Sequence, residues 1–439
     1  MPAPGDLCSF PGLTAEYFID TGHLTRVKNS DTAQLEFKKT SFRLSLYIHI
    51  PFCRRKCYYC DFYSISGFQE STEKKVVQEI LKQADYYLKT MDKASIASIF
   101  VGGGTPSLLK DEHLSLLLGG INRLLCTRNR DKSAIEWTIE ANPESLDKKF
   151  LQICAANNVN RLSIGMQSFD DDLLNKLGRL GSSKDNLRAL DLVEKYWSGR
   201  VSIDLLAGIP GQKAEYLVEE LNRLCSLSFI KHISLYTLTP LKGTLLDKQV
   251  NGEDQEEVWL QGSAALRSRG FNNYEIANFS LPGEESLHNL RYWHLEPYLG
   301  LGPAAVSTLP GERGDALRLS NPEDVNQFLD GNEDLWGTTV ERVPIRDFLF
   351  ETLMMGLRLK RGIPTALFSE RFNQSPEILL GGLWQEWRRR KLARSSHNYL
   401  ALSSRGRLHL DSLLVELSEY LDTRGHIIDT ALAGVLPFI

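Results

Sequence analysis

The sequence predicts an α/β protein: an open partial (β/α)6 barrel followed by a mostly helical, winged-helix-like C-terminal domain. Short apolar runs that favour strands alternate with amphipathic stretches that favour helices over about 200 residues, which is the pattern of a parallel sheet. Each predicted strand ends in glycine or polar residues, as strands do at the edge of a barrel that carries the site. From Pro344 onward the apolar residues recur at helical spacing.

Six strand-then-helix units follow one another in the chain. The strands are expected at residues 43–50, 96–101, 135–140, 161–164, 201–206 and 232–238. Helices are expected at residues 69–89, 111–125, 147–156 and 214–226, with further helical segments up to residue 196. Such units join parallel strands by right-handed crossovers. Six of them are too few to close a regular eight-stranded barrel, so we expect the sheet to stay open.

Four regions are predicted along the 439 residues, a length that exceeds one compact core. Residues 1–42 form an N-terminal extension with no assigned role, and residues 43–280 form the barrel core. Residues 281–343 form a linker and cover, because Gly300–Asn332 is punctuated by glycine and proline. In residues 344–439, short strands at Tyr399–Leu402 and Arg407–Leu410 would make the hairpin of a winged helix.

The composition limits the partners and the compartment. The net charge is 51 − 55 = −4, so no global basic field recruits nucleic acid, and no apolar run reaches the length of a membrane span. The basic segment Trp387–Lys391 could suggest DNA contact, but one short patch on an acidic protein favours a solvated helix face. The N-terminus lacks the features of a secretory signal. Seven cysteines, an odd number, argue against a disulfide framework, so we expect a cytoplasmic protein.

Three of those cysteines, Cys53, Cys57 and Cys60, lie on one predicted loop directly after a buried strand. A structural zinc site usually takes four ligands in two separated pairs, and no second pair follows here. Three thiolates on one loop instead suit three irons of a [4Fe-4S] cluster and leave the fourth iron open. The alternative is a chance group of buried or disulfide-forming cysteines. The other four cysteines look like ordinary residues.

The spacing Cys-x3-Cys-x2-Cys resembles that of the radical S-adenosylmethionine (SAM) superfamily. The resemblance implies that the open iron chelates the amino and carboxylate groups of SAM, and that a reductant protein supplies the electron that cleaves it. It also implies the residues that contact SAM; the glycines could instead belong to an ordinary tight βα turn, and the others could be satisfied polar or core residues at strand ends. These residues are Tyr47, Tyr59, Gly103, Gly104, Thr105, Glu140, Gln167, Arg179 and Asp204.

From about residue 43 to 421 the chain resembles the oxygen-independent coproporphyrinogen III oxidase-like proteins, and among them the heme chaperone HemW branch. Two features carry the choice of branch. Phe62 stands where true oxidases have a fourth cysteine, and the block His288-Asn289-x-x-Tyr292-Trp293 is typical of the chaperones. In that branch the block is linked to heme binding; an imidazole can ligate heme iron and aromatic rings can cover a macrocycle.

The resemblance therefore implies a radical SAM-type heme chaperone that passes heme to an apo-hemoprotein client. His288, Asn289, Tyr292 and Trp293 would bind heme, or they could be a core histidine beside core aromatic residues. The alternative function is oxidative decarboxylation of coproporphyrinogen III, an oxidoreductase reaction. Histidines that the family commonly has are missing at Gly181 and Val306, which concerns the substrate side more than the cluster.

Overall fold

The computed structural model describes residues 25–26, 41–126, 135–244, 246–250, 252–311, 314–394, 398–425 and 432. Among them no helix is both long enough and apolar enough to cross a membrane. The predicted N-terminal extension, residues 1–42, lies almost wholly outside the described residues. Its one described strand, β1 (Thr25–Arg26), pairs with β13 (Thr339–Val343) at the edge of the main sheet.

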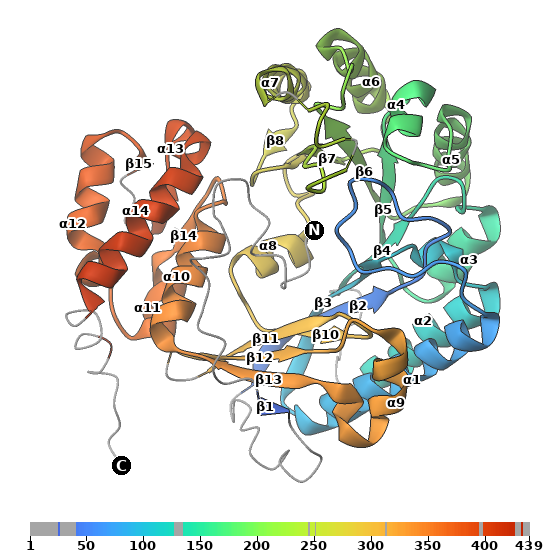
Figure 1. Ribbon diagram of the computed structural model, residues 1–439, viewed down its shortest axis with the longest axis horizontal. Coiled ribbons are helices and arrows are strands. Elements are labelled where there is room, and N and C mark those ends of the chain that lie inside the picture. Colours follow the sequence, from blue (N-terminus) through green and yellow to red (C-terminus); the bar gives the residue numbers. More distant parts are fainter. Residues whose placement is uncertain are drawn as a thin grey trace.

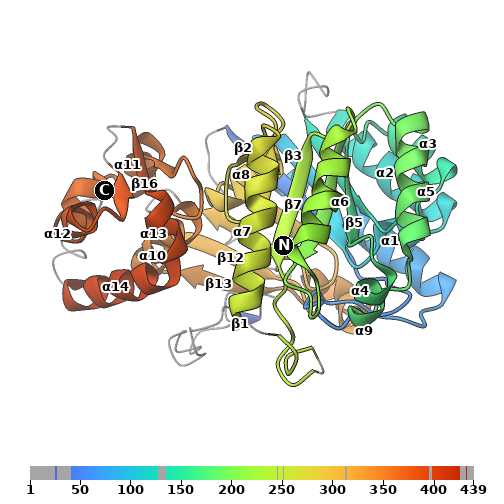
Figure 2. The ribbon, with the colours of Figure 1, turned by 90° about the horizontal axis from the view of Figure 1, so that it is seen from above.

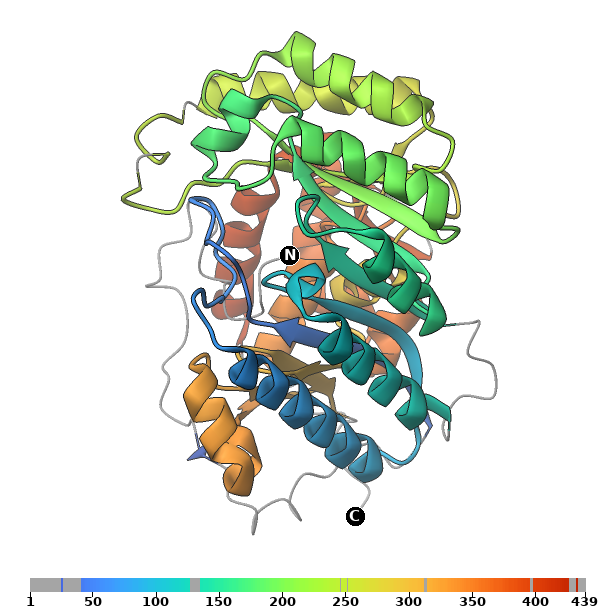
Figure 3. The same cartoon turned by 90° about the vertical axis from the view of Figure 1, so that its right-hand side faces the viewer.

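The predicted open barrel is confirmed, with six neighbouring parallel strands and helices on its convex side (Figures 1 and 3). The strands are β2 (Phe42–Ile50), β3 (Ala94–Gly103), β4 (Glu136–Ala141), β5 (Arg161–Gln167), β6 (Arg200–Ala207) and β7 (His232–Thr237). The helices are α1 (Glu70–Thr90), α2 (Asp111–Cys126), α3 (Lys148–Ala156), α4 (Asp171–Lys176), α5 (Ser183–Tyr196), α6 (Ala214–Ser226) and α7 (Gly252–Ser268). Every strand and helix predicted within the barrel core is present.

The two faces of this sheet differ in chemistry. On β2, the side chains of Leu44, Leu46 and Ile48 belong to the large apolar core that includes α1. Ser45 alternates with them on the other face, where it accepts a hydrogen bond from Ser98 of β3. Parallel sheets usually bury apolar side chains on both faces. The concave face of the sheet is therefore polar at this position, unlike the apolar faces that parallel sheets usually have.

The segment predicted as a linker, Gly300–Asn332, instead continues the sheet. It contributes β10 (Tyr298–Leu301), β11 (Val306–Pro310), β12 (Ala316–Ser320) and α9 (Val325–Asp330). The 3-10 helix η5 (Gly331–Gly337) and β13 come next along the chain. β10 runs parallel to β2 and extends the sheet on that side. Beyond β7 the sheet ends in β9 (Asn278–Ser280) and β8 (Asn272–Asn273). The glycines and prolines that suggested a linker lie in the tight connections between short strands.

The C-terminal region is mostly helical, as predicted, and stands beside the open side of the barrel (Figure 2). Its helices are α10 (Ile345–Gly356), α11 (Thr365–Phe372), α12 (Pro376–Arg389), α13 (Ser404–Leu408) and α14 (Leu410–Thr423). A small sheet joins β14 (Ile363–Pro364), β16 (Tyr399–Leu402) and β15 (Ala393–Arg394). The predicted strand Arg407–Leu410 is wrong: the Ser403 hydroxyl accepts a hydrogen bond from the Gly406 amide and starts α13 there.

Residues of the basic segment on α12 form contacts within the C-terminal region. Trp387 is buried and its indole nitrogen donates to Glu416 at 2.8 Å. Arg390 pairs with the same carboxylate at 2.7 Å, and Arg389 pairs with Glu386 at 2.7 Å. These pairs fit the predicted solvated helix face.

Candidate metal centre and cofactor site

The cysteine loop begins where β2 ends and is held on both sides by backbone hydrogen bonds. The Cys53 amide donates to the Ile65 carbonyl at 3.0 Å, and the Tyr58 amide donates to the Leu177 carbonyl at 3.0 Å. Cys57 and Cys60 close a turn through the Cys60 amide and the Cys57 carbonyl, 3.2 Å apart. All three thiols are free and half-buried. The structure thus brings the three predicted cluster ligands to one loop at the mouth of the barrel.

The three thiols suit a cluster better than a single ion. A structural zinc ion usually takes four protein ligands, whereas this loop offers the three thiols of Cys53, Cys57 and Cys60. Burial, together with the neighbouring Cys57 and Cys53, raises the pKa of Cys60 to about 11, so the thiolates need a positive centre. The donor set fits three irons of a cluster.

The glycines after β3 let the next loop lie directly against the cysteine loop. A Cβ on Gly104 would lie 2.7 Å from the carbonyl oxygens of Ile50 and Phe52, too close for any side chain. The Gly104 amide donates to the Ile50 carbonyl at 2.7 Å. As a result the Thr105 hydroxyl lies 3.4 Å from Cys53 Sγ. Gly103 itself has φ +103°, a conformation that glycine adopts readily.

Two carboxylates line the mouth of the barrel from β4 and β6, the strands on either side of β5. Glu140, at the end of β4, accepts a hydrogen bond from the Gly103 amide at 3.1 Å, and burial raises its pKa to about 7. Asp204, on β6, accepts a hydrogen bond from Ser163 at 2.9 Å, while its other oxygen is buried without a partner in the described structure. An unpaired buried carboxylate oxygen is costly, so it fits a site that receives donors from a ligand.

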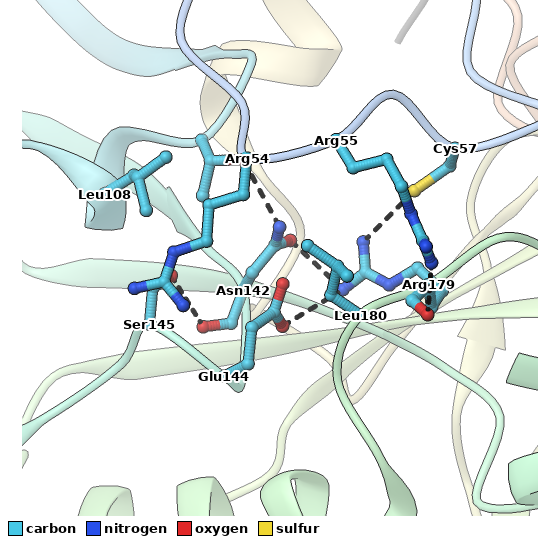
Figure 4. A pocket seen from close by; sticks show the side chains of 10 residues that line it. Arg54, Arg55, Cys57, Leu108, Asn142, Glu144, Ser145, Arg179 and Leu180 are labelled. Atoms are coloured by element: carbon cyan, nitrogen blue, oxygen red, sulfur yellow. Dashed lines mark hydrogen bonds and ion pairs between the residues drawn. The ribbon is translucent and has the colours of Figure 1, made fainter. Parts of the chain in front are cut away.

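Arg179 connects the strand ends to the cysteine loop (Figure 4). Its guanidinium donates to the Gly165 carbonyl at 2.7 Å and to Asn142 at 3.2 Å, and it lies 4.0 Å from Cys57 Sγ. Arg179, Asn142 and Cys57 line one small pocket with Thr105 and Glu144. Gln167 is close by, at a register shift of β5 where it has φ +66°. Of the residues predicted to contact SAM, Thr105 and Arg179 line this pocket, together with the predicted cluster ligand Cys57.

The two predicted tyrosines are placed differently. The Tyr47 hydroxyl donates to His49 Nδ1 at 3.0 Å, because His49 Nε2 donates to the Tyr63 carbonyl at 2.9 Å. Burial lowers the pKa of His49 to about 4, so the ring is neutral in this chain. Tyr59 packs against a small apolar cluster that includes Leu173 and Leu177. Tyr59 also lies beside Arg179, which lines the pocket next to the cysteines.

The predicted heme block forms a short helix, α8 (Leu287–Trp293), inside the curve of the sheet (Figure 1). His288 is buried, its Nδ1 atom is 3.0 Å from the Ser98 hydroxyl, and its ring lies 5.2 Å from that of Phe100. Burial lowers the pKa of His288 to about 3. Tyr292 and Trp293 pack against the core of the C-terminal region. α8 therefore joins the barrel to the C-terminal helices.

Comparison with known proteins identifies the family of this chain. The model of the radical SAM superfamily matches residues 47–224, and that of the HemN C-terminal domain matches residues 343–409. Heme chaperone HemW of Buchnera aphidicola is 35% identical over 75% of this chain and 86% of its own. HemW of Bacillus subtilis is 30% identical over 83% of this chain and 96% of its own. This chain belongs to the HemW family of radical SAM proteins.

Two further relatives extend the comparison of this HemW-family chain. A cattle protein named radical S-adenosyl methionine domain-containing protein 1, mitochondrial, is 33% identical over 86% of this chain and 88% of its own. The solved structure of coproporphyrinogen III oxidase (HemN) from Escherichia coli matches 85% of this chain and 90% of its own, with a TM-score of 0.69 and 20% identity. That structural likeness supports the fold.

Two residues of this HemW-family site, Asn142 and Arg55, were not predicted from the sequence. Asn142 links Arg179 to Thr105, with 3.2 Å between its Nδ2 and Thr105 Oγ1. Arg55 donates to the Gly178 carbonyl at 2.6 Å and so fixes the loop that bears Arg179. Asn142 follows β4 by one residue, so its position at a strand end was a usable signal. Arg55 offered none, because its partners lie 123 positions away.

Proposed function

We propose that this protein binds heme and passes it to apo-hemoproteins. The observation that carries the proposal is the likeness to relatives named heme chaperone HemW, 30–35% identical over most of both chains. Cys53, Cys57 and Cys60 would hold a [4Fe-4S] cluster, and SAM would sit beside it. When bound, that pair supplies one-electron chemistry at the open iron.

The mouth of the barrel supports the SAM part of the proposal. Glu140 and the Gly103–Thr105 loop would receive the amino group of SAM, and Arg179 carries a positive charge toward its carboxylate. The unpaired oxygen of Asp204 would accept hydrogen bonds from hydroxyl groups. Gln167, Tyr47 and Tyr59 would line the same site. These residues bind and orient the ligand and keep water from the thiolates.

The interior of the barrel supports the heme part. His288 Nε2 has no hydrogen-bond partner among the described residues, so it can offer a lone pair to iron. Asn289 and Trp293 each carry a buried polar atom without a partner in the described structure. With Tyr292 they provide polar and aromatic surface around His288. Neutral His288, which burial favours, is the form that ligates a metal.

A second candidate, oxidative decarboxylation of coproporphyrinogen III, shares the fold with the E. coli enzyme. Phe62, in place of a fourth cysteine, counts against it. The client hemoprotein and a reductant protein are the macromolecular partners that we propose, in the reducing cytoplasm. Formation of protoporphyrinogen by the reconstituted protein would instead decide for the enzyme.

A heme titration of anaerobically reconstituted protein, followed by absorption, tests the proposal. We expect saturable binding that is weakened in His288→Ala. His113→Ala is the matched control, because His113 is an equally buried histidine that bonds to Glu73 outside the barrel. No saturable binding to the wild-type protein, or equal binding by His288→Ala, would contradict the chaperone proposal or the heme site, respectively.

A further inference from the structure

A buried chain of hydrogen bonds leads from a cation to His288. Arg291 Nε donates to the Ser45 hydroxyl at 2.8 Å. The Ser98 hydroxyl donates to Ser45 at 2.9 Å, and Ser98 Oγ is 3.0 Å from His288 Nδ1. Arg291, Ser45, Ser98 and His288 are all buried. Burial therefore shields this series of hydrogen bonds from competing water.

The direction of these hydrogen bonds determines which ring nitrogen of His288 carries the proton. A guanidinium can only donate, so Ser45 Oγ accepts from Arg291. Ser98 has a single hydroxyl proton, which it gives to Ser45. At His288 the Ser98 oxygen can then only accept, so Nδ1 carries the proton and donates. Nε2 is left as an unprotonated nitrogen, since a neutral imidazole has one N–H.

A second set of contacts fixes the backbone of α8. The carboxylate of Glu136, on β4, accepts from the Leu287 amide at 3.0 Å and from the His288 amide at 2.8 Å. Arg161, on β5, lies 3.6 Å from that carboxylate. The ring of His288 is thus held at Nδ1 by β3, while its backbone is held by β4.

From this geometry we infer that Ser98, Ser45 and Arg291 are positioning residues that hold His288 in the Nδ1–H tautomer, with Nε2 free to ligate iron. The inference rests on the proposed function for its metal, but the tautomer itself is a property of this chain without heme. Hydrogen bonding at one ring nitrogen commonly orients a ligating histidine and raises its basicity at the other.

Another buried histidine of the barrel has hydrogen-bond partners at both of its ring nitrogens. His232, on β7, bonds to the Ser202 hydroxyl through Nδ1 at 2.6 Å and to the Tyr274 hydroxyl through Nε2 at 2.8 Å. Both of its nitrogens are used within the fold. His288 has the same serine contact at Nδ1 and no such partner at Nε2 among the described residues. The difference lies in the free nitrogen, so Ser202 offers a matched control for Ser98.

The first test measures the tautomer in heme-free protein. Two-bond ¹⁵N–¹H correlation spectra of the protein labelled with ¹⁵N-histidine distinguish protonated Nδ1 from protonated Nε2, and the His288→Gln variant assigns the signal. We expect the Nδ1–H form of His288 at neutral pH. An Nε2–H form, or a mixture of the two, would overturn the inference whether or not the protein binds heme.

The second test measures heme dissociation from Ser98→Ala, Ser98→Thr and Ser202→Ala. Loss of a hydrogen bond behind a metal ligand typically costs 10–100-fold in affinity, so we expect at least about tenfold faster dissociation from Ser98→Ala. Ser98→Thr keeps the hydroxyl and should restore the rate, and Ser202→Ala should leave it unchanged. Equal rates for Ser98→Ala and wild type would overturn the inference. Failure of the wild type to bind heme would overturn the proposed function and leave the tautomer result standing.

Discussion

The mouth of the barrel and the α8 region are built in different ways. At the mouth, adjacent loops meet through backbone hydrogen bonds, as between Gly104 and Ile50, and the ligands come from short continuous motifs. At α8, side chains from several distant strands converge on one helix, as Glu136 and Ser98 do on His288. The first region depends on close backbone approach, and the second on a network of buried polar groups, which fails when a single member is lost.

The largest expected effect is at the mouth. Cys53→Ser removes one of three thiolates, and we expect the cluster absorbance of the reconstituted protein to disappear. Cys225→Ser is the control, because Cys225 lies on α6 and should leave the spectrum intact. An intact cluster in Cys53→Ser would contradict the assignment of the ligands and would remove the contrast between the two regions.

The α8 region is tested by Glu136→Ala. The change leaves Arg161 buried without its carboxylate and the α8 amides without an acceptor, so we expect a loss of about 3 kcal/mol in the free energy of unfolding. Denaturant unfolding measures it. Glu284→Ala breaks a half-exposed pair with Arg200, 3.1 Å apart, and should cost less than about 1 kcal/mol. Equal losses would mean that the network does not hold α8.

The smallest effect tests the close approach of the backbone. A methyl group on Gly104 meets two carbonyl oxygens at 2.7 Å, so Gly104→Ala should destabilise the protein by about 1–3 kcal/mol and lower its cluster content. Gly381→Ala is the control, because nothing lies within 4 Å of its Cβ on α12 and alanine favours a helix. A Gly104→Ala variant as stable as the control variant would show that the two loops can separate at little cost.

The same contrast explains what the sequence could predict. The cysteine loop, the glycine loop and the strand order follow from motifs and periodicity that are local in the chain, and the structure has all of them. Ser98, Glu136 and Arg291 carry no local signal, because each contacts partners about 150 to 250 positions away. The alternation of Ser45 with leucines on β2 was the one visible hint. The predicted linker failed because short strands interrupted by glycine and proline look like loops.

The contacts of α8 also bear on how the molecule unfolds. Leu295, just after this helix, lies in the core of the C-terminal region, while Arg371 of α11 donates to the His294 carbonyl at 2.9 Å. On the sheet side, Arg318 of β12 pairs with Glu351 of α10 at 2.6 Å. Neither half can lose its structure without exposing buried groups of the other. Thermal melting should therefore be cooperative across the barrel and the C-terminal helices, wherever a boundary is drawn between them.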